Sequence, residues 1–141
     1  MPDLPAPTPA APPSEPAPNG RKVLCIEDEH FISELYVRVL TRGGYRVDAV
    51  ADGKQALDAA LTNDYDIILL DLMLPNVPGI EILRKLKDPT LQPPIKAKII
   101  VTTNLEQRED VRADIEKQAD GYVVKAELTP HELVDLLDTI R

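Results

Sequence analysis

From Arg21 onward, short apolar runs alternate with longer stretches in which apolar residues recur at helical spacing. The five short runs, which predict strands, are residues 22–26, 45–50, 66–70, 98–102 and 121–124. After each run, apolar residues three or four positions apart predict an amphipathic helix. Five strand–helix pairs in strict alternation predict an α/β fold with a doubly wound parallel sheet, right-handed crossovers and helices on both faces.

Two local signals support this reading of the chain. The run DIILLD at residues 66–71 is apolar between its two aspartates, as expected for a strand that helices cover on both faces. The last helical stretch begins with a capping box, in which Thr129 is the N-cap, Pro130 the first helical residue and Glu132 lies three residues after the cap.

The first 20 residues, MPDLPAPTPAAPPSEPAPNG, hold eight of the fourteen prolines and no aromatic residue. Such a segment cannot bury enough apolar surface to offset the entropy lost on ordering. Residues 1–20 are therefore predicted to form a disordered Pro/Ala-rich tail, and residues 21–141 a single domain. The segment also lacks the basic and hydrophobic parts of a secretory signal.

Net charge and motif content argue against several classes of function. The net charge of −8 and the lack of a basic stripe disfavour direct nucleic-acid binding. The chain has no glycine-rich phosphate loop, no HExxH motif and no paired CxxC motif. No apolar run approaches membrane-spanning length, so membrane insertion is not expected. The single cysteine, Cys25, lies in an apolar run, which predicts a small buried side chain and a protein of the reducing cytoplasm.

Polar side chains follow four of the five predicted strands. Glu27 and Asp28 come after the first strand, Asp71 after the third, Thr103 after the fourth and Lys125 after the fifth. In open parallel sheets, function collects beyond the carboxyl ends of the strands, where the strand order reverses. If the order is 2-1-3-4-5, that point falls between the first and third strands, and these residues form one shallow site.

Each residue type has a physical use at such a site. Carboxylate oxygens of Asp28 and Asp71, with a backbone carbonyl from the turn, suit Mg²⁺, which prefers a few carboxylates, several waters and substrate phosphate. Asp71, nearest the metal, would be a nucleophile that forms an acyl phosphate. Lys125 supplies a compact positive charge for the phosphoryl oxygens, and the hydroxyl of Thr103 can donate a hydrogen bond to another of them.

Four segments of the chain resemble the receiver domains of two-component response regulators, the CheY-like superfamily, and the resemblance covers residues 21–141. These segments are IEDE, DIILLDLMLPNVPG, VTTNLEQ and DGYVVKAELTPHEL. The resemblance implies a flavodoxin-like fold, with a five-stranded parallel sheet in the order 2-1-3-4-5 and five helices. It further implies a signalling phosphoacceptor that promotes its own phosphoryl transfer and dephosphorylation, rather than an enzyme with a separate substrate.

The resemblance implies a role for each matching residue. Asp71 is the phosphoacceptor, Asp28 binds Mg²⁺ directly, and Glu27 acts mainly through water. The backbone carbonyl of Met73 is the third protein ligand of the ion. Tyr122 is the switch aromatic, which changes rotamer once the switch hydroxyl moves toward the phosphoryl group.

Two threonines, Thr102 and Thr103, are candidates for the switch hydroxyl. The spacing to Lys125 in the family and the order Thr-Asn-Leu favour Thr103, which leaves Thr102 as a strand-end residue. Lys125 is then the lysine that contacts the phosphoryl group.

The chain departs from the family at two positions. Ala126 follows Lys125 where the family usually has proline, which leaves the Lys125–Ala126 geometry open because a cis bond there costs roughly 3–4 kcal/mol. Glu27 stands where aspartate is more common.

Met73 and Leu105 are apolar where the family tunes water access, so slow self-dephosphorylation is expected.

The partners implied by the resemblance are a sensor histidine kinase or a histidine phosphotransfer protein. A downstream protein would bind the face made by the fourth helix, the fifth strand and the fifth helix, and the protein would be a monomer or a phosphorylation-promoted dimer. No output domain is expected after the last helix, so the domain would act through protein contacts or be a fragment.

Other functions and other candidate residues remain open at this point. A pseudo-receiver would keep the fold and bind partners without phosphorylation. A haloacid-dehalogenase-type phosphatase also uses a strand-end aspartate, Mg²⁺ and a lysine. Such an enzyme needs a second acid two residues after the nucleophile, and this chain has Met73 there, so it would lack the general acid. His30 and His131 have no partner at ligand spacing and are predicted to be surface residues.

Overall fold

The structure is a computed structural model of the 141-residue chain, and it describes residues 19–104 and 107–140. The strands are β1 (Lys22–Ile26), β2 (Arg46–Val50), β3 (Ile67–Asp71), β4 (Lys98–Thr103) and β5 (Gly121–Val124). The helices are α1 (His30–Arg42), α2 (Gly53–Leu61), α3 (Gly79–Leu86), α4 (Glu109–Gln118) and α5 (Pro130–Asp138), and a 3-10 turn, η1, spans Lys125–Glu127. All five predicted strand–helix pairs are therefore present.

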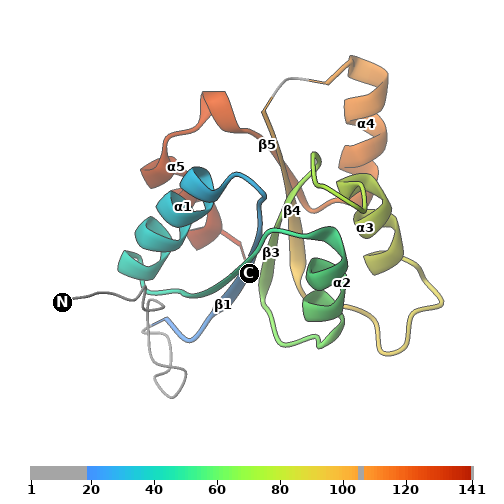
Figure 1. The fold of residues 1–141 in the computed structure, drawn as a ribbon, viewed down its shortest axis with the longest axis horizontal. Coiled ribbons are helices and arrows are strands. Elements are labelled where there is room, and N and C mark those ends of the chain that lie inside the picture. Colours follow the sequence, from blue (N-terminus) through green and yellow to red (C-terminus); the bar gives the residue numbers. More distant parts are fainter. Residues whose placement is uncertain (1–18, 105–106, 141) are drawn as a thin grey trace.

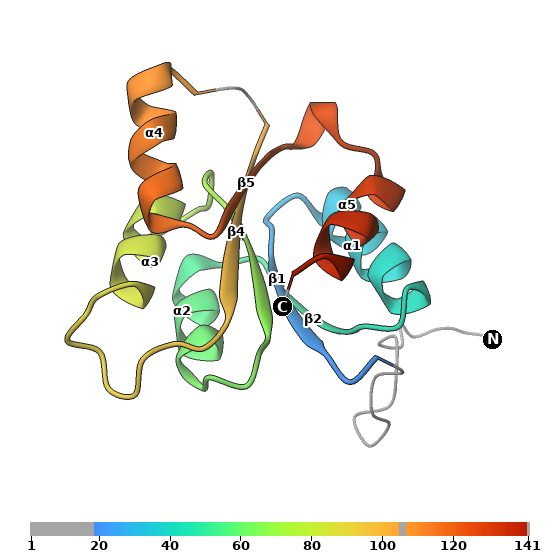
Figure 2. The same cartoon turned by 180° about the vertical axis from the view of Figure 1, so that it is seen from behind.

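The five strands form one parallel sheet in the order β2-β1-β3-β4-β5. This confirms the predicted fold class and strand order. Helices α1 and α5 cover one face of the sheet, and α2, α3 and α4 cover the other (Figure 1 and Figure 2). The strand order reverses between β1 and β3, so the residues that follow these two strands lie side by side.

Alternate residues of the strands supply two separate cores. In β1, Val23 and Cys25 pack with α1 and α5, whereas Leu24 and Ile26 pack with α2 and α3. This alternation follows from the two-residue period of a strand. Every residue of β3 is buried, as expected for a central strand with helices on both faces. The prediction of a buried Cys25 is also confirmed.

Two strands run further toward the site than the sequence pattern predicts. β3 begins at Ile67 and includes Asp71, and β4 includes Thr103. Asp71 pairs with Thr102 in the β3–β4 register, so its backbone belongs to the sheet and not to the following loop. The apolar pattern placed both strand ends too early because polar residues at the end of a strand give no hydrophobic signal.

The loop between β3 and α3 folds back tightly on the end of β3. The Leu72 N–H donates to Thr102 O at 3.1 Å, and the Gly79 N–H donates to Leu72 O at 3.1 Å. A Cβ atom on Gly79 would lie 2.3 Å from the carbonyl oxygen of Asp71, so only glycine fits there. This close approach keeps the start of α3 against the end of β3.

The capping box at the start of α5 is confirmed. The Thr129 side chain accepts from the Glu132 N–H at 3.1 Å, and Glu132 Oε1 accepts from the Thr129 N–H at 2.8 Å. Among the described residues, the only cis peptide bond is Gln92–Pro93. The Lys125–Ala126 bond, which the sequence leaves open, is therefore trans.

Residues 1–18 of the predicted tail lie outside the described residues, so its predicted disorder stays a prediction. The described residue Asn19 donates its N–H to Gly44 O at 3.1 Å. None of the helices in the described part of the chain has the length and apolar character needed to cross a membrane.

Candidate functional site

The carboxyl ends of β1 and β3 carry two buried acids. The N–H of Glu27 donates to Val50 O at 3.0 Å, so the residue continues the pairing of β1 with β2. The Glu27 and Asp71 residues are only 2% and 1% exposed, while the next acid along the chain, Asp28, is exposed. One member of the acidic group therefore faces water and two are held inside.

The three acids meet as the sequence predicts. Glu27, Asp28 and Asp71 each place one carboxylate oxygen within 4.8 Å of those of the other two. Hard oxygen donors at this separation fit the preferences of Mg²⁺, and the exposed position of Asp28 gives water access to the group. The residues present therefore suit a magnesium ion.

Lys125 reaches the same cluster from the far side of β4. Its Nζ lies 2.5 Å from Glu27 Oε1 and 3.2 Å from Asp71 Oδ2. The lysine side chain is 6% exposed, so its charge and those of its partners are largely withdrawn from water. Removing one member of such a buried group leaves the others uncompensated, which makes the three residues energetically dependent on one another.

Burial and like charge perturb the ionisation of the site. Burial raises the pKa of Glu27 to about 7, against the hydrogen bond with Lys125, and the neighbouring Asp71 charge raises it further. Burial also acts to lower the pKa of Lys125, but its contacts with Glu27 and Asp71 outweigh that effect and raise it. Lys125 is consequently positive at neutral pH.

Cys25 lies on β1 within the electrostatic reach of this cluster. Burial, followed by the charge of Glu27, raises the pKa of its thiol to about 12. The thiol remains protonated at neutral pH and is a poor nucleophile. Asp71 is therefore the better candidate for covalent chemistry.

The Asp71 carboxylate is oriented from both sides. Its Oδ1 accepts a hydrogen bond from the Met73 N–H at 3.0 Å, while Oδ2 faces Lys125. The resemblance implies a metal-binding role for the carbonyl of Met73 but does not indicate this role of its N–H. No residue-type signal could have revealed it, because the contact depends on the path of the backbone after β3. The Met73 side chain is 66% exposed.

Thr103 lies at the end of β4 with its residue 1% exposed. Its Oγ1 accepts a hydrogen bond from Gln107 Nε2 at 3.3 Å. Thr102 is also buried, at 2% exposed, and sits opposite Asp71 in the strand register. The choice of Thr103 as the switch hydroxyl stays a prediction.

Tyr122 on β5 is half-buried and is held by residues around α4. Its hydroxyl accepts a hydrogen bond from the Gln107 N–H at 3.4 Å, and the Arg112 guanidinium lies 4.5 Å from the ring centroid. Gln107, which contacts both Thr103 and Tyr122, has no distinguishing signal in the sequence. An isolated glutamine before a helix is an ordinary surface residue by its local pattern.

Other predicted positions fall outside the cluster. His30 and His131 are exposed, as predicted, and His30 pairs with Glu34 at 3.1 Å on α1. Leu105 lies outside the described residues, so its proposed effect on water access is not tested.

Comparison with known proteins gives a consistent result. A family model described as the response regulator receiver domain matches residues 23–138. The chain is 39% identical over 119 residues to the response regulator ArlR of Staphylococcus epidermidis, covering 84% of this chain and 50% of that protein. The chain therefore spans about half the length of this curated relative.

Solved structures agree with the sequence matches. The receiver domain of the Francisella response regulator 1452 superposes with a TM-score of 0.74 at 27% identity, covering 85% of this chain and 95% of that chain. The chemotaxis response regulator CheY4 of Vibrio cholerae also superposes with a TM-score of 0.74 at 27% identity, covering 86% and 98%. On the family match over residues 23–138 and this shared fold, the chain belongs to the receiver domain family of two-component response regulators.

Proposed function

We propose that this receiver domain accepts a phosphoryl group on Asp71 in a Mg²⁺-dependent reaction and thereby switches a protein-binding surface. The observation that carries the proposal is that buried Asp71, acids Glu27 and Asp28, and Lys125 meet at one edge of the sheet. Four polar groups of the types that phosphoryl transfer requires are thus brought together from three separate strand ends.

The metal site would use the carboxylates of Asp28 and Asp71, the backbone carbonyl of Met73, and Glu27 acting mainly through water. When bound, Mg²⁺ offsets the repulsion between these acids and an incoming phosphoryl group. Lys125 already neutralises part of the acidic charge from the other side.

In the transfer itself, a carboxylate oxygen of Asp71 attacks the phosphorus atom of a phosphohistidine. An O–P bond forms, the P–N bond breaks, and its electron pair stays on the imidazole nitrogen. The Met73 N–H restrains the orientation of the carboxylate, and the ammonium of Lys125 lies where it can attract the phosphoryl oxygens. The donor is a sensor histidine kinase or a histidine phosphotransfer protein, and the response regulator relatives support a kinase.

Phosphorylation adds about −1.5 to −2 charge at pH 7 beside Lys125. The hydroxyl of Thr103 then donates a hydrogen bond to a phosphoryl oxygen, and Tyr122 follows by changing rotamer. These movements alter the face made by α4, β5 and α5, which binds a downstream protein or a second copy of the domain. We assign this function to residues 21–141, with residues 1–20 as a tail and without direct binding of nucleic acid.

The test is phosphorylation by acetyl phosphate with Mg²⁺, read as the intact mass of the protein. We expect one added phosphoryl group on the wild type and on Asp58→Asn, a matched control in which an exposed acid of α2 loses its charge. We expect none on Asp71→Asn, and none on the wild type with excess EDTA.

A phosphoryl group that still appears on Asp71→Asn, or without metal, would contradict the proposal. If acetyl phosphate fails to label the wild type, a panel of histidine kinases charged with ATP provides the second assay. Failure there as well would leave a domain that binds partners without phosphorylation.

A further inference from the structure

One residue outside the acidic cluster contacts both members of the proposed switch. Gln107 precedes α4, and its side-chain Nε2 donates to Thr103 Oγ1 at 3.3 Å. Its backbone N–H donates to the Tyr122 hydroxyl at 3.4 Å. A single position therefore joins the end of β4, the middle of β5 and the segment that leads into α4.

The environment of these contacts makes them consequential. Thr103 is 1% exposed, so water competes poorly for its hydroxyl, and a buried polar group depends on its protein partners. On the other side of Gln107, Arg112 of α4 lies over the Tyr122 ring at 4.5 Å. The first part of α4 is thus tied to β4 and β5 through a small set of polar contacts.

Gln107 also has space in which to move. It lines a groove of about 410 Å³ between α3 and α4, together with Leu72 and Met73 from the loop that follows Asp71. Gln107 therefore contacts the switch hydroxyl and lines the same groove as the loop that follows the phosphoacceptor. If Thr103 moves toward a phosphoryl group, the Gln107 amide loses this acceptor and can turn into the groove.

From these contacts we infer that Gln107 is a positioning residue that holds Thr103 in the unphosphorylated arrangement and couples its movement to α4. The inference rests on the proposed function, since it assigns a regulatory role within the same switch. A contact present only in the unphosphorylated arrangement favours that arrangement, so its removal shifts the population toward the phosphorylation-competent one.

The first experiment compares the rate of phosphorylation by acetyl phosphate in wild type and Gln107→Leu. Leucine fills a similar volume and keeps the backbone N–H to Tyr122, but it removes the side-chain donor. We expect a rate increase of about two- to tenfold, the factor that one neutral hydrogen bond supplies. Gln107→Ala, which has no side-chain hydrogen-bonding group, is a second variant that should change the rate in the same direction.

Gln118→Leu is the matched control, because the Gln118 amide contacts only Asp114 among the described hydrogen bonds, at the other end of α4. Its rate should equal that of the wild type. Thermal unfolding of all variants distinguishes a shifted switch from a general loss of stability, since a merely destabilised domain should not be phosphorylated faster.

A second readout isolates the contact with Thr103. Backbone amide chemical shifts of α4 should move in Gln107→Leu toward their positions in the beryllofluoride-bound wild type, and this movement should vanish when Thr103 is already Val. Wild-type rates in both Gln107 variants, or a shift that persists with Thr103→Val, would overturn the inference. Failure of the wild type to be phosphorylated would instead count against the proposed function.

Discussion

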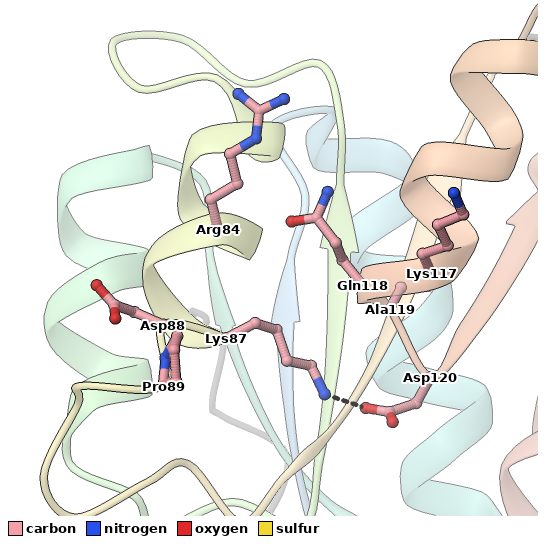
Figure 3. A pocket seen from close by; sticks show the side chains of 8 residues that line it. All are labelled: Arg84, Lys87, Asp88, Pro89, Lys117, Gln118, Ala119 and Asp120. Carbon is pink, nitrogen blue, oxygen red and sulfur yellow. Dashed lines mark hydrogen bonds and ion pairs between the residues drawn. The ribbon is translucent and has the colours of Figure 1, made fainter.

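The sheet has one edge where the parallel strands end and another where they begin. At each of them a lysine contacts one or more carboxylates from distant parts of the chain. At the carboxyl edge, Lys125 contacts Glu27 and Asp71 with side chains that are 6% and 2% exposed. At the amino edge, Lys87 after α3 contacts Asp120 at 2.9 Å, with side chains 34% and 28% exposed. Both residues line a pocket of about 620 Å³. Figure 3 shows Lys87 pointing across from the end of α3 to Asp120.

The difference between the two edges is one of solvation. The Lys87–Asp120 pair remains in partial contact with water, so its attraction is screened and contributes about 0–1 kcal/mol. The Lys125 group is buried, so each charge depends on the others. A lysine with its carboxylate partners therefore makes a partly exposed ion pair at one edge and a buried, strongly coupled group at the other.

The largest contrast should come from removing each lysine in turn. In metal-free buffer, Lys125→Met should lower the free energy of unfolding by about 3–5 kcal/mol, because it leaves two buried carboxylates without a counter-charge. Urea denaturation measures the change, and added Mg²⁺ should restore part of it. A loss no larger than that of Lys87→Met would mean that burial does not separate the two sites.

The second effect is a pH dependence confined to the buried site. Burial raises the pKa of Glu27 from its ordinary 4.5 to about 7, so the folded protein holds a proton that the unfolded chain has released between these pH values. The corresponding contribution to stability is present below pH 4.5 and is lost as the pH rises through 7. Carboxyl NMR titration without metal should show a midpoint near 7 that disappears in Glu27→Gln, and a midpoint near 4.5 would refute the expectation.

Removing the Asp120 carboxylate should lower the free energy of unfolding by an intermediate amount, and the cause is a lost hydrogen bond rather than the lost ion pair. Its Oδ2 accepts the Ile99 N–H at 2.8 Å as well as contacting Lys87. Asp120→Ala leaves that backbone donor at the start of β4 without its partner and should cost about 1–3 kcal/mol in thermal or urea unfolding. Asp120→Asn keeps an acceptor and should cost less, so equal losses for the two variants would argue against this explanation.

The smallest effect should be that of Lys87→Met. Loss of a half-exposed ion pair should change the unfolding free energy by less than about 1 kcal/mol, and the difference from wild type should shrink at high salt. Phosphorylation by acetyl phosphate should be unchanged, since Lys87 lies at the opposite edge from Asp71. A slower reaction would show that the two edges are coupled.

Much of the architecture could be predicted because its signals are local. The apolar periods located all five strand–helix pairs, and the capping box at Thr129 placed the start of α5. The strand-end positions of Glu27, Asp28, Asp71 and Lys125 also led to one predicted cluster, which the structure brings together. The ends of β3 and β4 were misplaced because Asp71 and Thr103 are polar residues inside a sheet.

Other features of the site had no signal in the local pattern. Gln107 donates hydrogen bonds to Thr103 and Tyr122, and the Met73 N–H donates one to Asp71. These contacts depend on how loops cross the edge of the sheet. The pairing of Lys87 with Asp120 likewise joins two helix ends that the sequence separates by 33 residues. Residue type alone did not distinguish these positions from other polar surface residues.

The amino-acid sequence by itself determined the order of strands and helices, the parallel sheet and the edge at which the acidic residues and Lys125 gather, because hydrophobic period and helix capping act over a few residues. Only the tertiary structure decided which charges are buried together. Lys125 lies 98 residues from Glu27 and 54 from Asp71 along the chain, and they meet because the sheet brings the ends of β1, β3 and β5 to one edge. Withdrawal from water at that edge raises the pKa of Glu27 and makes the three residues depend on one another.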